Sequence, residues 1–331
     1  MKEWVEKARR PEVVGGIGGF AGLFDASALK AYKRPLLATS ADGVGTKVAI
    51  AQAMDKHDTI GFDLVGMLVD DLVVCGAEPL FLTDYIACGS VVPERIADIV
   101  KGIAQACAET GTALLGGETA EHPGLLKPDE YDVAGSTTGV VEADKLLGAE
   151  LVKPGDVVIA MASSGLHANG YSLVRHVFFD KAGWKLDREV PEFASTLGEQ
   201  LLIPTKLYAK PCLDLAAAVE VHAMSHITGG GLAANLARVV PESVSVRVDR
   251  STWSQHAVFK LVGELGGVAR ADLEQALNMG VGMVALVAPE HADDAVRLLG
   301  DKGVPSWIAG DVAEAGIHGA GGSVTLENDY V

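Results

Sequence analysis

Two stretches of the sequence place glycines and carboxylates directly after an apolar run. Asp42-Gly43-Val44-Gly45-Thr46-Lys47 follows residues 35–38, and Gly116-Gly117-Glu118-Thr119-Ala120-Glu121 follows residues 112–115. Glycine lets the backbone approach a ligand closely, backbone N–H groups bind phosphate oxygens, and a carboxylate can hold a hard cation such as Mg²⁺. The pair predicts a nucleotide-phosphate site, with residues 43–46 and 116–117 against phosphate and with Asp42 and Glu118 as Mg²⁺ ligands.

Lys47 ends the first stretch, where its ammonium group would balance the charge of a bound phosphate. The P-loop spacing G-x-x-x-x-G-K-[ST] is absent, so an ordinary glycine turn with a surface lysine is the alternative. A further glycine pattern, Gly16-Ile17-Gly18-Gly19-Phe20-Ala21, fits G-x-G-x-x-A. The charged segment before it is no strand, and we reject a dinucleotide site there.

Glu118, Glu121 and His122 lie close enough in the sequence to suggest a metal site. The two glycines before them and Pro123 after them indicate an irregular loop rather than a helix with ligands four residues apart. Oxygen ligation of Mg²⁺ by Glu118 is therefore favoured over zinc. Glu121 and His122 are equally consistent with solvated loop residues.

Asp71 interrupts an apolar stripe within residues 58–75. The stripe has the spacing of an amphipathic helix and consists of Ile60, Leu64, Met67, Leu68, Leu72 and Cys75. Burying a carboxylate is costly, so Asp71 should face a cation, a metal or strong donors. We expect it to be the third Mg²⁺ ligand, with a helix-terminal salt bridge as the alternative. Asp63 and Asp70 fall together on the flank and are expected to form a solvated acidic face.

Two loops in the second half of the chain each precede a helix. The first is Ser163-Ser164-Gly165-Leu166-His167-Ala168-Asn169-Gly170-Tyr171-Ser172, and the second is His226-Ile227-Thr228-Gly229-Gly230-Gly231-Leu232. We expect Ser164 and Asn169 of the first loop, and residues 228–230 of the second, to contact phosphate. His167 could act as a general acid or base. The alternatives are a helix cap with a loop histidine, and a plain flexible turn.

The elements that carry these residues alternate between strands and helices, which indicates an α/β protein. In the first half, strands are expected at 80–88, before residue 116 and at 131–141, and a helix from Pro93 should bury Ile96, Ile99, Val100, Ile103 and Cys107. In the second half, strands are expected at 157–161, 244–248, 282–287 and around 307–309, with helices from residue 171, at 211–221 and at 291–299. The turn at 153–156 places a domain boundary there, which gives domains 1–152 and 153–331.

Composition excludes several classes of protein. A chain of 331 residues with 49% hydrophobic residues favours two ordered domains. A net charge of −17 disfavours a nucleic-acid binder. The longest apolar runs are too short for a membrane helix and the N-terminus lacks a signal peptide, so we expect a cytoplasmic protein that does not bind membranes. The four cysteines, Cys75, Cys88, Cys107 and Cys212, are expected to be buried reduced thiols.

Taken in order, these motifs resemble the phosphoribosylformylglycinamidine cyclo-ligase family, also called aminoimidazole ribonucleotide synthetases. The resemblance spans nearly the whole chain. It rests on 9–13 with 15–20, 42–47, 57–61, 71–74 with Gly76-Ala77-Glu78-Pro79, 116–121, 131–135, 163–175 and 226–232. Thiamine monophosphate, selenide and hydrogenase-maturation enzymes would share the acidic site, but no cysteine-rich N-terminal loop or C-terminal cysteine tail is present.

The resemblance implies an ATP-dependent ring closure in purine biosynthesis. ATP would phosphorylate the formyl oxygen of formylglycinamidine ribonucleotide, and the amidine nitrogen would then attack that carbon and expel phosphate. Mg²⁺ on Asp42, Asp71 and Glu118 would neutralise the transferring phosphoryl oxygens, Lys47 would assist, and His167 would transfer a proton. The products would be aminoimidazole ribonucleotide, ADP and phosphate.

The resemblance also implies a two-domain ATP-dependent synthetase fold of the α/β (α+β) class, each domain being a mixed sheet covered by helices. The first domain would bind ATP and Mg²⁺ and would form a homodimer in which the sheets join into a barrel. The second would complete the cleft for substrate and nucleotide. Family members carry a further N-terminal segment expected to cover the nucleotide, whereas this sequence starts eight residues before Arg9. A catalytically weak nucleotide-binding homologue is the alternative function.

Overall fold

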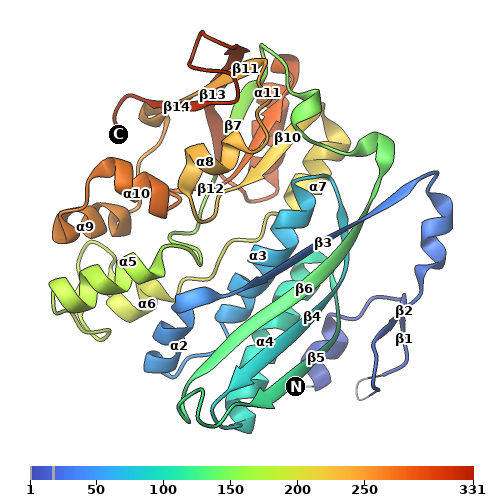
Figure 1. Cartoon of the computed structure of the whole chain (residues 1–331), viewed down its shortest axis with the longest axis vertical. Coiled ribbons are helices and arrows are strands. Elements are labelled where there is room, and N and C mark those ends of the chain that lie inside the picture. Colours follow the sequence, from blue (N-terminus) through green and yellow to red (C-terminus); the bar gives the residue numbers. More distant parts are fainter. Residues whose placement is uncertain (1, 17–18) are drawn as a thin grey trace. The chain divides into compact units, whose positions relative to one another are not determined.

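The structure is a computed structural model that describes residues 2–16 and 19–331 (Figure 1). Its internal contacts divide the chain into two compact units, Met1–Leu146 and Leu147–Val331, and each is described by itself. Ile17 and Gly18, which belong both to the rejected dinucleotide pattern and to one stretch of the family resemblance, lie outside the described residues.

The first unit is built on a four-stranded mixed sheet in the order β3-β6-β4-β5. Strand β6 is antiparallel to β3 and β4, whereas β4 and β5 are parallel, as their connection through helix α4 requires. The elements are α1 (Lys2–Lys7), β1 (Val13–Val14), β2 (Leu23–Phe24), β3 (Pro35–Gly43), α2 (Val48–Met54), α3 (Ile60–Val73), β4 (Glu78–Cys88), α4 (Pro93–Thr110), β5 (Ala113–Glu121) and β6 (Tyr131–Glu142).

Helix α4 forms where the sequence predicts it. Pro93 occupies the first turn, where its missing N–H group costs nothing, and Gly111 ends the helix with a φ of 77°. All five predicted apolar residues of α4 are buried. The helix packs against α3 and β5, so it covers the sheet on the same side as α3.

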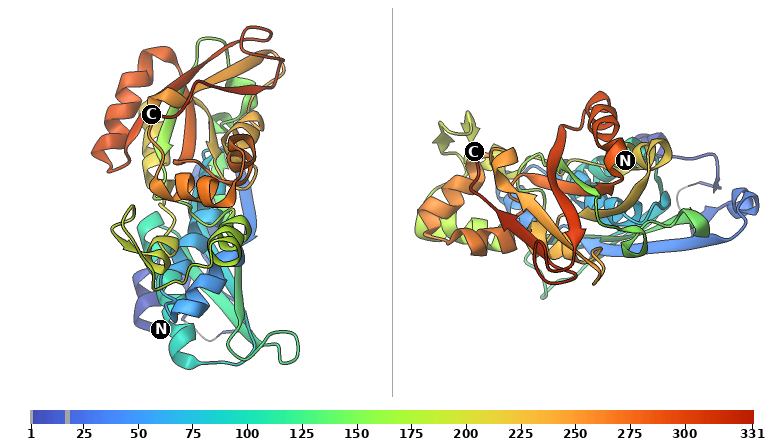
Figure 2. Two further views of the ribbon diagram at one scale, coloured as in Figure 1. Left: turned by 90° about the vertical axis from the view of Figure 1, so that its left-hand side faces the viewer. Right: turned by 90° about the horizontal axis from the view of Figure 1, so that it is seen from above.

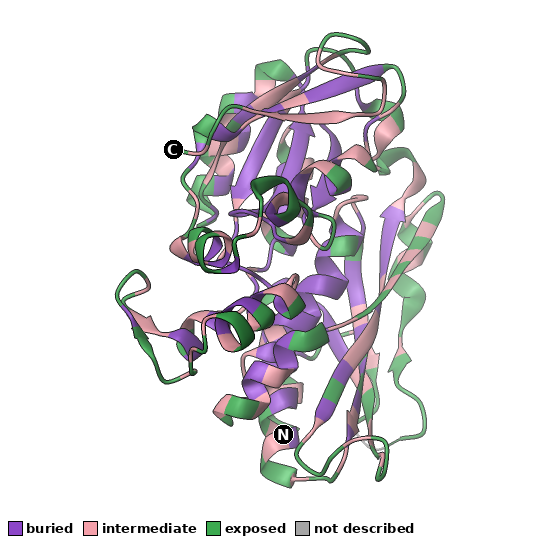
Figure 3. Cartoon of the chain, turned by 60° about the vertical axis from the view of Figure 1, so that its left-hand side comes forward, coloured by how far each residue is buried: buried purple, intermediate pink, exposed green. Residues whose placement is uncertain are grey.

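Helix α3 approaches its neighbours at backbone distance. A Cβ atom on Gly61 would lie 2.1 Å from the backbone nitrogen of Ile103 in α4, and one on Gly135 would lie 2.8 Å from Cδ1 of Leu68. Glycines on three elements, Gly61, Gly102 and Gly135, therefore let α3 fit between α4 and the sheet. This close packing buries α3 almost all round (Figure 3).

The register of the sheet aligns two residues of the predicted phosphate region, Asp42 and Gly117, with two residues that were not predicted there. Asp42 pairs with Gly135, Gly135 with Asp84, and Asp84 with Gly117, one residue from each strand. Paired residues point to the same face of a sheet, and here Leu68 identifies it as the face that α3 covers. The Asp84 carboxylate occupies the space of the missing Gly117 side chain, because a Cβ there would lie 2.3 Å from its Oδ1.

The opposite face of this sheet carries exposed residues. Leu37, Thr39, Ala41, Thr83 and Tyr85 alternate with the residues that face the helices and are all exposed. Leu37 and Tyr85 are 65% and 41% exposed, which is high for large apolar side chains in a sheet. The first unit thus has one face covered by its own helices and one open face.

The second unit contains a six-stranded sheet (Figure 2). Its strand order is β10-β12-β7-β13-β11-β14, and all neighbouring pairs are antiparallel except β11–β14. Its elements are β7 (Val157–Ala162), α5 (Tyr171–Arg175), β8 (Glu189–Val190), β9 (Ser195–Thr196), α6 (Leu197–Leu201), α7 (Ala209–Ala218), β10 (Val221–His226), α8 (Gly231–Ala237), β11 (Val244–Asp249), α9 (Ala257–Gly266), α10 (Arg270–Ala276), β12 (Val281–Val287), α11 (Ala292–Asp301), β13 (Ser306–Glu314) and β14 (Val324–Glu327).

Strands β10 and β12 are buried at every residue, which means that both faces of this sheet are covered. Helix α11 packs with α7 and against β7 and β13, and α8 packs against β10, β14 and α10. Each unit is therefore a mixed sheet covered by helices, as the sequence predicts, and the second has the larger sheet.

Several element boundaries differ from the prediction. The helix expected at 211–221 ends at Ala218, and residues 221–226 form strand β10 instead. Strand β3 continues through Asp42 and Gly43, and β5 continues through Glu121, so the expected irregular loop at 116–121 is wrong. Glycine has no side-chain penalty that would stop a strand whose neighbours supply a full hydrogen-bond ladder. The sequence analysis also missed β10, β14, α9 and α10.

The described residues include no helix that is long and apolar enough to cross a membrane. All four cysteines are free thiols; Cys88, Cys107 and Cys212 are buried and Cys75 is half-buried. The expectation of reduced thiols in the core is confirmed for three of the four positions.

The contact at Gly117 predicts an asymmetric response to alanine. Gly117→Ala should destabilise the first unit by about 1–3 kcal/mol, because its Cβ would collide with the Asp84 carboxylate. Gly116→Ala is the matched control, since its Cβ would meet no atom within 4 Å. Urea unfolding followed by tryptophan fluorescence and circular dichroism measures both. Equal stability of the two variants would contradict this packing.

Candidate phosphate and metal-binding site

The first predicted stretch forms the end of strand β3 and a tight turn into helix α2. Asp42 is exposed, and its Oδ1 accepts the N–H of Gly43 at 2.7 Å. Gly45 has a φ of 72°, a conformation that favours glycine, and one 3₁₀ turn over Gly45–Lys47 then leads into the helix. Gly45 and Thr46 are exposed, so the backbone of this turn can be reached by a ligand.

Lys47 does not lie at the surface. Its Nζ is 2.8 Å from Oδ1 of Asp63, and both side chains are 0% exposed. Burial lowers the pKa of Lys47, and the Asp63 carboxylate opposes that shift. The interpretation of Lys47 as a surface lysine is therefore wrong. The ion pair with Asp63 fixes the turn to helix α3. Contact between Lys47 and a bound phosphate stays a prediction.

The predicted exposure of the three α3 aspartates is reversed. Asp63 and Asp70 are 0% exposed, whereas Asp71 is exposed. The sheet-facing row is Leu64, Leu68 and Leu72, and such a row turns by about 40° at each step because four residues exceed one helical turn. At the last turn the sheet therefore lies on the side of Leu72, and Asp71, about 100° away, points out.

The structure does not bring the three predicted Mg²⁺ ligands together. Glu118 pairs with Tyr85 and so points to the open face of the sheet, whereas Asp42 lies on the face of Asp84. Their strands are three spacings apart, about 14 Å. Among residues 2–16 and 19–331, no group of three or more His, Cys, Asp or Glu side chains could hold a metal ion. The side chains of Asp42, Asp71 and Glu118 are nevertheless all exposed, so each carboxylate can reach a solvated cation.

Asp84 is a buried acid that the sequence analysis missed. It is 9% exposed, and burial raises the pKa of its carboxyl from 3.8 to about 7. The same carboxylate also helps to raise the pKa of the Cys107 thiol, whose main cause is burial. Asp84 lies in an alternating strand, Leu82 to Cys88, at a position that faces the helices. That alternation is the sequence signal that could have identified it.

Glu121 and His122 have specific partners. Glu121 Oε1 accepts the N–H of Val91 at 2.7 Å, and the Tyr85 hydroxyl lies 3.1 Å from Nε2 of His122. The two rings also meet edge to face at 6.4 Å. These contacts fix the end of β5 and do not assemble a zinc site.

In the second unit, the loop after β7 is held closely by buried groups. Ser164 donates its backbone N–H to Nε2 of His167 at 3.1 Å, and its hydroxyl donates to the carbonyl oxygen of Pro204 at 2.7 Å. His167 is 2% exposed and has a φ of 59°. The predicted acid or base thus lies inside its own loop, with Nε2 as an acceptor.

The two predicted loops of the second unit lie side by side. The closest atom to a Cβ built on Gly229 is Oδ1 of Asn169, at 3.7 Å. Gly170 and Gly231 both abut the end of α10, because added Cβ atoms would lie 2.8 Å and 1.6 Å from the carbonyl oxygens of Ala276 and Glu274. The end of α10 therefore contacts both loops and brings four predicted residues close together: Asn169, Thr228, Gly229 and Gly230.

Asn235 supports the second loop from within α8. Its side-chain amide donates to the carbonyl oxygens of Thr228, Gly229 and Gly231 at 3.2, 3.1 and 2.8 Å. The carbonyl groups of the glycine turn are thereby directed into the protein. Sequence reasoning missed Asn235 because the asparagine follows the glycine run within the helix.

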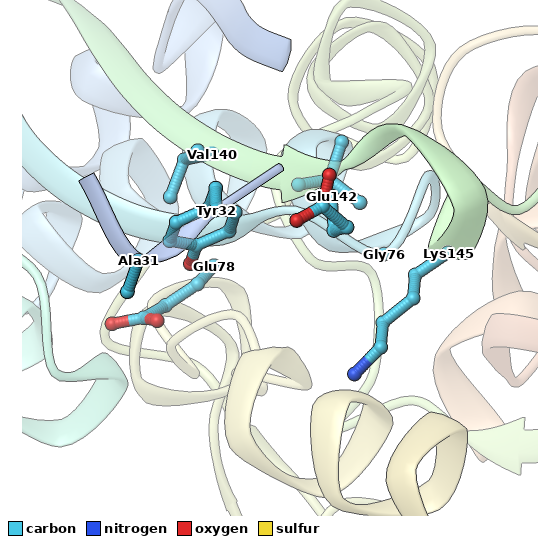
Figure 4. A pocket seen from close by; sticks show the side chains of 8 residues that line it. Ala31, Tyr32, Gly76, Glu78, Val140, Glu142 and Lys145 are labelled. Atoms are coloured by element: carbon cyan, nitrogen blue, oxygen red, sulfur yellow. The ribbon is translucent and has the colours of Figure 1, made fainter. Parts of the chain in front are cut away.

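A cavity of about 310 Å³ lies elsewhere in the first unit, beside the end of β6 (Figure 4). Tyr32, Glu78, Glu142 and Lys145 contribute its polar groups. Burial raises the pKa of the Tyr32 phenol, and the carboxylates of Glu78 and Glu142 add to that shift. The predicted phosphate and metal residues do not line this cavity.

Family models cover both units. Residues 24–141 match the N-terminal domain of AIR synthase related proteins, and residues 153–321 match their C-terminal domain. These two matches define a two-domain protein of the AIR synthase related class.

Curated relatives narrow this class. The chain is 48% identical over 323 residues to the phosphoribosylformylglycinamidine cyclo-ligase of Geobacillus kaustophilus (strain HTA426), covering 97% of this chain and 93% of the relative. It is 47% identical over 324 residues to the protein of that name from Geobacillus thermodenitrificans (strain NG80-2), covering 98% of this chain and 93% of that relative. The chain belongs to the phosphoribosylformylglycinamidine cyclo-ligase family, a family of ligases in purine biosynthesis.

Solved structures share the fold at low sequence identity. Thiamine-monophosphate kinase from Stenotrophomonas maltophilia K279a matches with a TM-score of 0.72 and 20% identity, over 99% of this chain and 96% of that chain. Hydrogenase maturation protein HypE in complex with ATP matches with a TM-score of 0.65 and 17% identity, over 98% and 88%. These likenesses support the fold and do not discriminate among the reactions of the class.

The buried acid predicts a pH dependence of stability. The folded pKa of Asp84 is above its ordinary value, so the folded protein binds an extra proton between about pH 4 and pH 7. Its contribution to stability is present below pH 4 and is lost as the pH rises through 7, by up to about 4 kcal/mol.

The Asp84→Asn variant should therefore gain stability relative to the parent as the pH rises from 5 to 8. Urea midpoints of both proteins across this range measure the difference. A constant difference at all pH values would show that Asp84 does not titrate in this window.

Proposed function

We propose that this protein catalyses the ATP-dependent cyclisation of formylglycinamidine ribonucleotide to 5-aminoimidazole ribonucleotide, with release of ADP and phosphate. The observation that carries the proposal is the 48% identity to a cyclo-ligase over 97% of the chain. ATP would transfer its terminal phosphoryl group to the formyl oxygen. The amidine nitrogen would then attack the formyl carbon, and the phosphate would leave with the oxygen.

Mg²⁺ is part of the proposal, and exposed carboxylates support it. Asp42, Asp71 and Glu118 all offer accessible oxygen ligands of the kind that Mg²⁺ takes together with substrate phosphates. Because Asp42 and Glu118 point to different faces about 14 Å apart, we propose that they do not bind the same ion. Bound Mg²⁺ would neutralise charge on the phosphoryl oxygens.

The protein's other predicted site residues would position the substrates. The backbone of residues 43–46 and 116–117 would face ATP phosphates, and the paired loops with Ser164, Asn169 and residues 228–230 would hold phosphate in the second unit. His167 is proposed to move a proton during ring closure. Residues 1–152 would thus bind ATP and Mg²⁺, and 153–331 would complete the cleft. A cytoplasmic location belongs to the same proposal.

We also propose a homodimer in which first-unit sheets join into a barrel. The open face with Leu37, Thr39, Ala41, Thr83 and Tyr85 supports this, because a sheet with one uncovered face that exposes large apolar side chains gains by burying it.

The function is tested by phosphate release with Mg·ATP and formylglycinamidine ribonucleotide. The protein should turn over only when both are present. Asp71→Asn should reduce kcat at least tenfold without loss of stability, because Asp71 is exposed and its carboxylate is proposed to bind Mg²⁺.

Asp98→Asn, an exposed exchange on α4, is the control and should keep full activity. ATP binding without turnover would favour the nucleotide-binding homologue, and phosphorylation of thiamine monophosphate would favour a related kinase. Full turnover by Asp71→Asn would remove Asp71 from the metal site.

The dimer is tested by light scattering. Leu37→Glu should shift the protein to monomers, because a charge would replace an apolar side chain in the buried interface. Leu125→Glu places the same charge at another exposed leucine, 77% exposed, and should leave the dimer intact. A dimeric Leu37→Glu variant, or a monomeric parent, would refute this interface.

A further inference from the structure

Asn278 is a buried asparagine outside the two predicted loops. Both polar atoms of its side chain contact the first loop, which follows β7. It is 3% exposed. Its Nδ2 donates to the carbonyl oxygen of Gly165 at 2.9 Å, and its Oδ1 accepts the N–H of Gly280 at 2.9 Å. The Ser163 hydroxyl lies 3.3 Å from the same Oδ1. One side chain thus joins the loop after β7 to the start of β12.

The backbone around Asn278 is held in an unusual conformation. Met279 and Gly280 have φ values of 51° and 102°, and Val281 donates its N–H to the Asn278 carbonyl at 3.0 Å. Positive φ at both central residues is the pattern of a type I′ turn and is strained for methionine. Gly280 also accepts the backbone N–H of Ser163 at 2.9 Å. The turn and the loop therefore fix each other.

The loop fixed in this way sets the proton position on His167. The Ser164 N–H can only donate, so Nε2 of His167 must be an unprotonated acceptor. A neutral imidazole with an unprotonated Nε2 carries its proton on Nδ1. The His167 ring also packs closely against Gly282, because a Cβ atom on Gly282 would lie 2.6 Å from Cε1 of His167.

We propose that Asn278 is a positioning residue that holds the loop of residues 163–167 so that His167 stays in the Nδ1–H tautomer. The proposal deepens the proposed function and rests on it only for the role of His167 in proton transfer. With Nε2 occupied by the Ser164 N–H, the neutral ring can donate a hydrogen bond from Nδ1–H, and it can take up a proton only at Nε2, after the contact with Ser164 opens. Asn278 acts through the loop and does not itself meet the substrate.

The carbonyl of Gly165 makes Asn278 sensitive to substitution. Asn278→Asp keeps an acceptor for the Gly280 N–H but turns the Gly165 contact into one between two oxygens, which repel. Asn278→Ala removes both bonds without adding a buried charge. Either change releases the loop, and the Ser164 N–H then no longer selects the tautomer.

The tautomer is measured directly by ¹⁵N NMR of histidine-labelled protein, with His167→Gln identifying its signal among the nine histidines. The parent should show a pyridine-type Nε2 and a protonated Nδ1. Folded Asn278→Asp and Asn278→Ala should show a mixture of tautomers. An Nε2–H tautomer in the parent, or an unchanged signal in either folded variant, overturns the proposal; Asn278→Ala decides the question if the aspartate variant does not fold.

Kinetics separate this inference from the proposed function. Asn278→Ala should lower kcat by roughly tenfold to a hundredfold, with the KM for ATP nearly unchanged, because the loop geometry and not nucleotide binding is lost. Asn328→Asp is the control, as its exposed amide donates to Asp249 Oδ1 and is remote in sequence from the loop. A changed tautomer with unchanged kcat confirms the positioning role and refutes proton transfer by His167.

Discussion

The first unit depends on how closely helix α3 fits between α4 and the sheet. Gly61 and Gly102 let the two helices meet at their backbones, and Gly135 lets Leu68 touch the sheet. Packing at this distance leaves no room for water, so α3 is buried almost all round. Every polar side chain on the helix except one at its last turn must then be satisfied inside the protein, and that requirement shapes the candidate site.

The ion pair between Lys47 and Asp63 is the clearest consequence. A carboxylate at 0% exposure needs a partner, and Lys47 supplies it from the turn that follows the first glycine stretch. The turn is thereby attached to α3, while Asp42 and Gly45 stay accessible. Removing either partner would leave a buried charge and cost several kcal/mol, more than the pair itself contributes. Lys47 thus links the core of the unit to the backbone proposed to bind phosphate.

The sequence predicted the elements better than the exposure of single residues. Helix α4 was predictable because Pro93, Gly111 and the apolar stripe all indicate the same bounds. Asp71 was placed wrongly because helical spacing gives the angle of a residue but not the side from which the sheet approaches at the last turn. The alternation of strand β4 indicates that Asp84 faces the helices, but its contact with Gly117 depends on the register between two strands, which the sequence does not show. Helices and strands could be predicted from the local sequence, whereas the pairing of residues on distant strands could not.

The two units hold their candidate loops by different physical means. In the first, charge is buried beneath the turn, and a partly protonated acid lies under the second glycine stretch. In the second, neutral side-chain amides hold the loops. Asn235 donates to three carbonyl oxygens of one loop, and Asn278 donates to a carbonyl oxygen of the other. An amide keeps its donors at every pH, whereas a buried acid changes its charge near neutrality. The contacts that these two amides make with the loops therefore do not depend on pH.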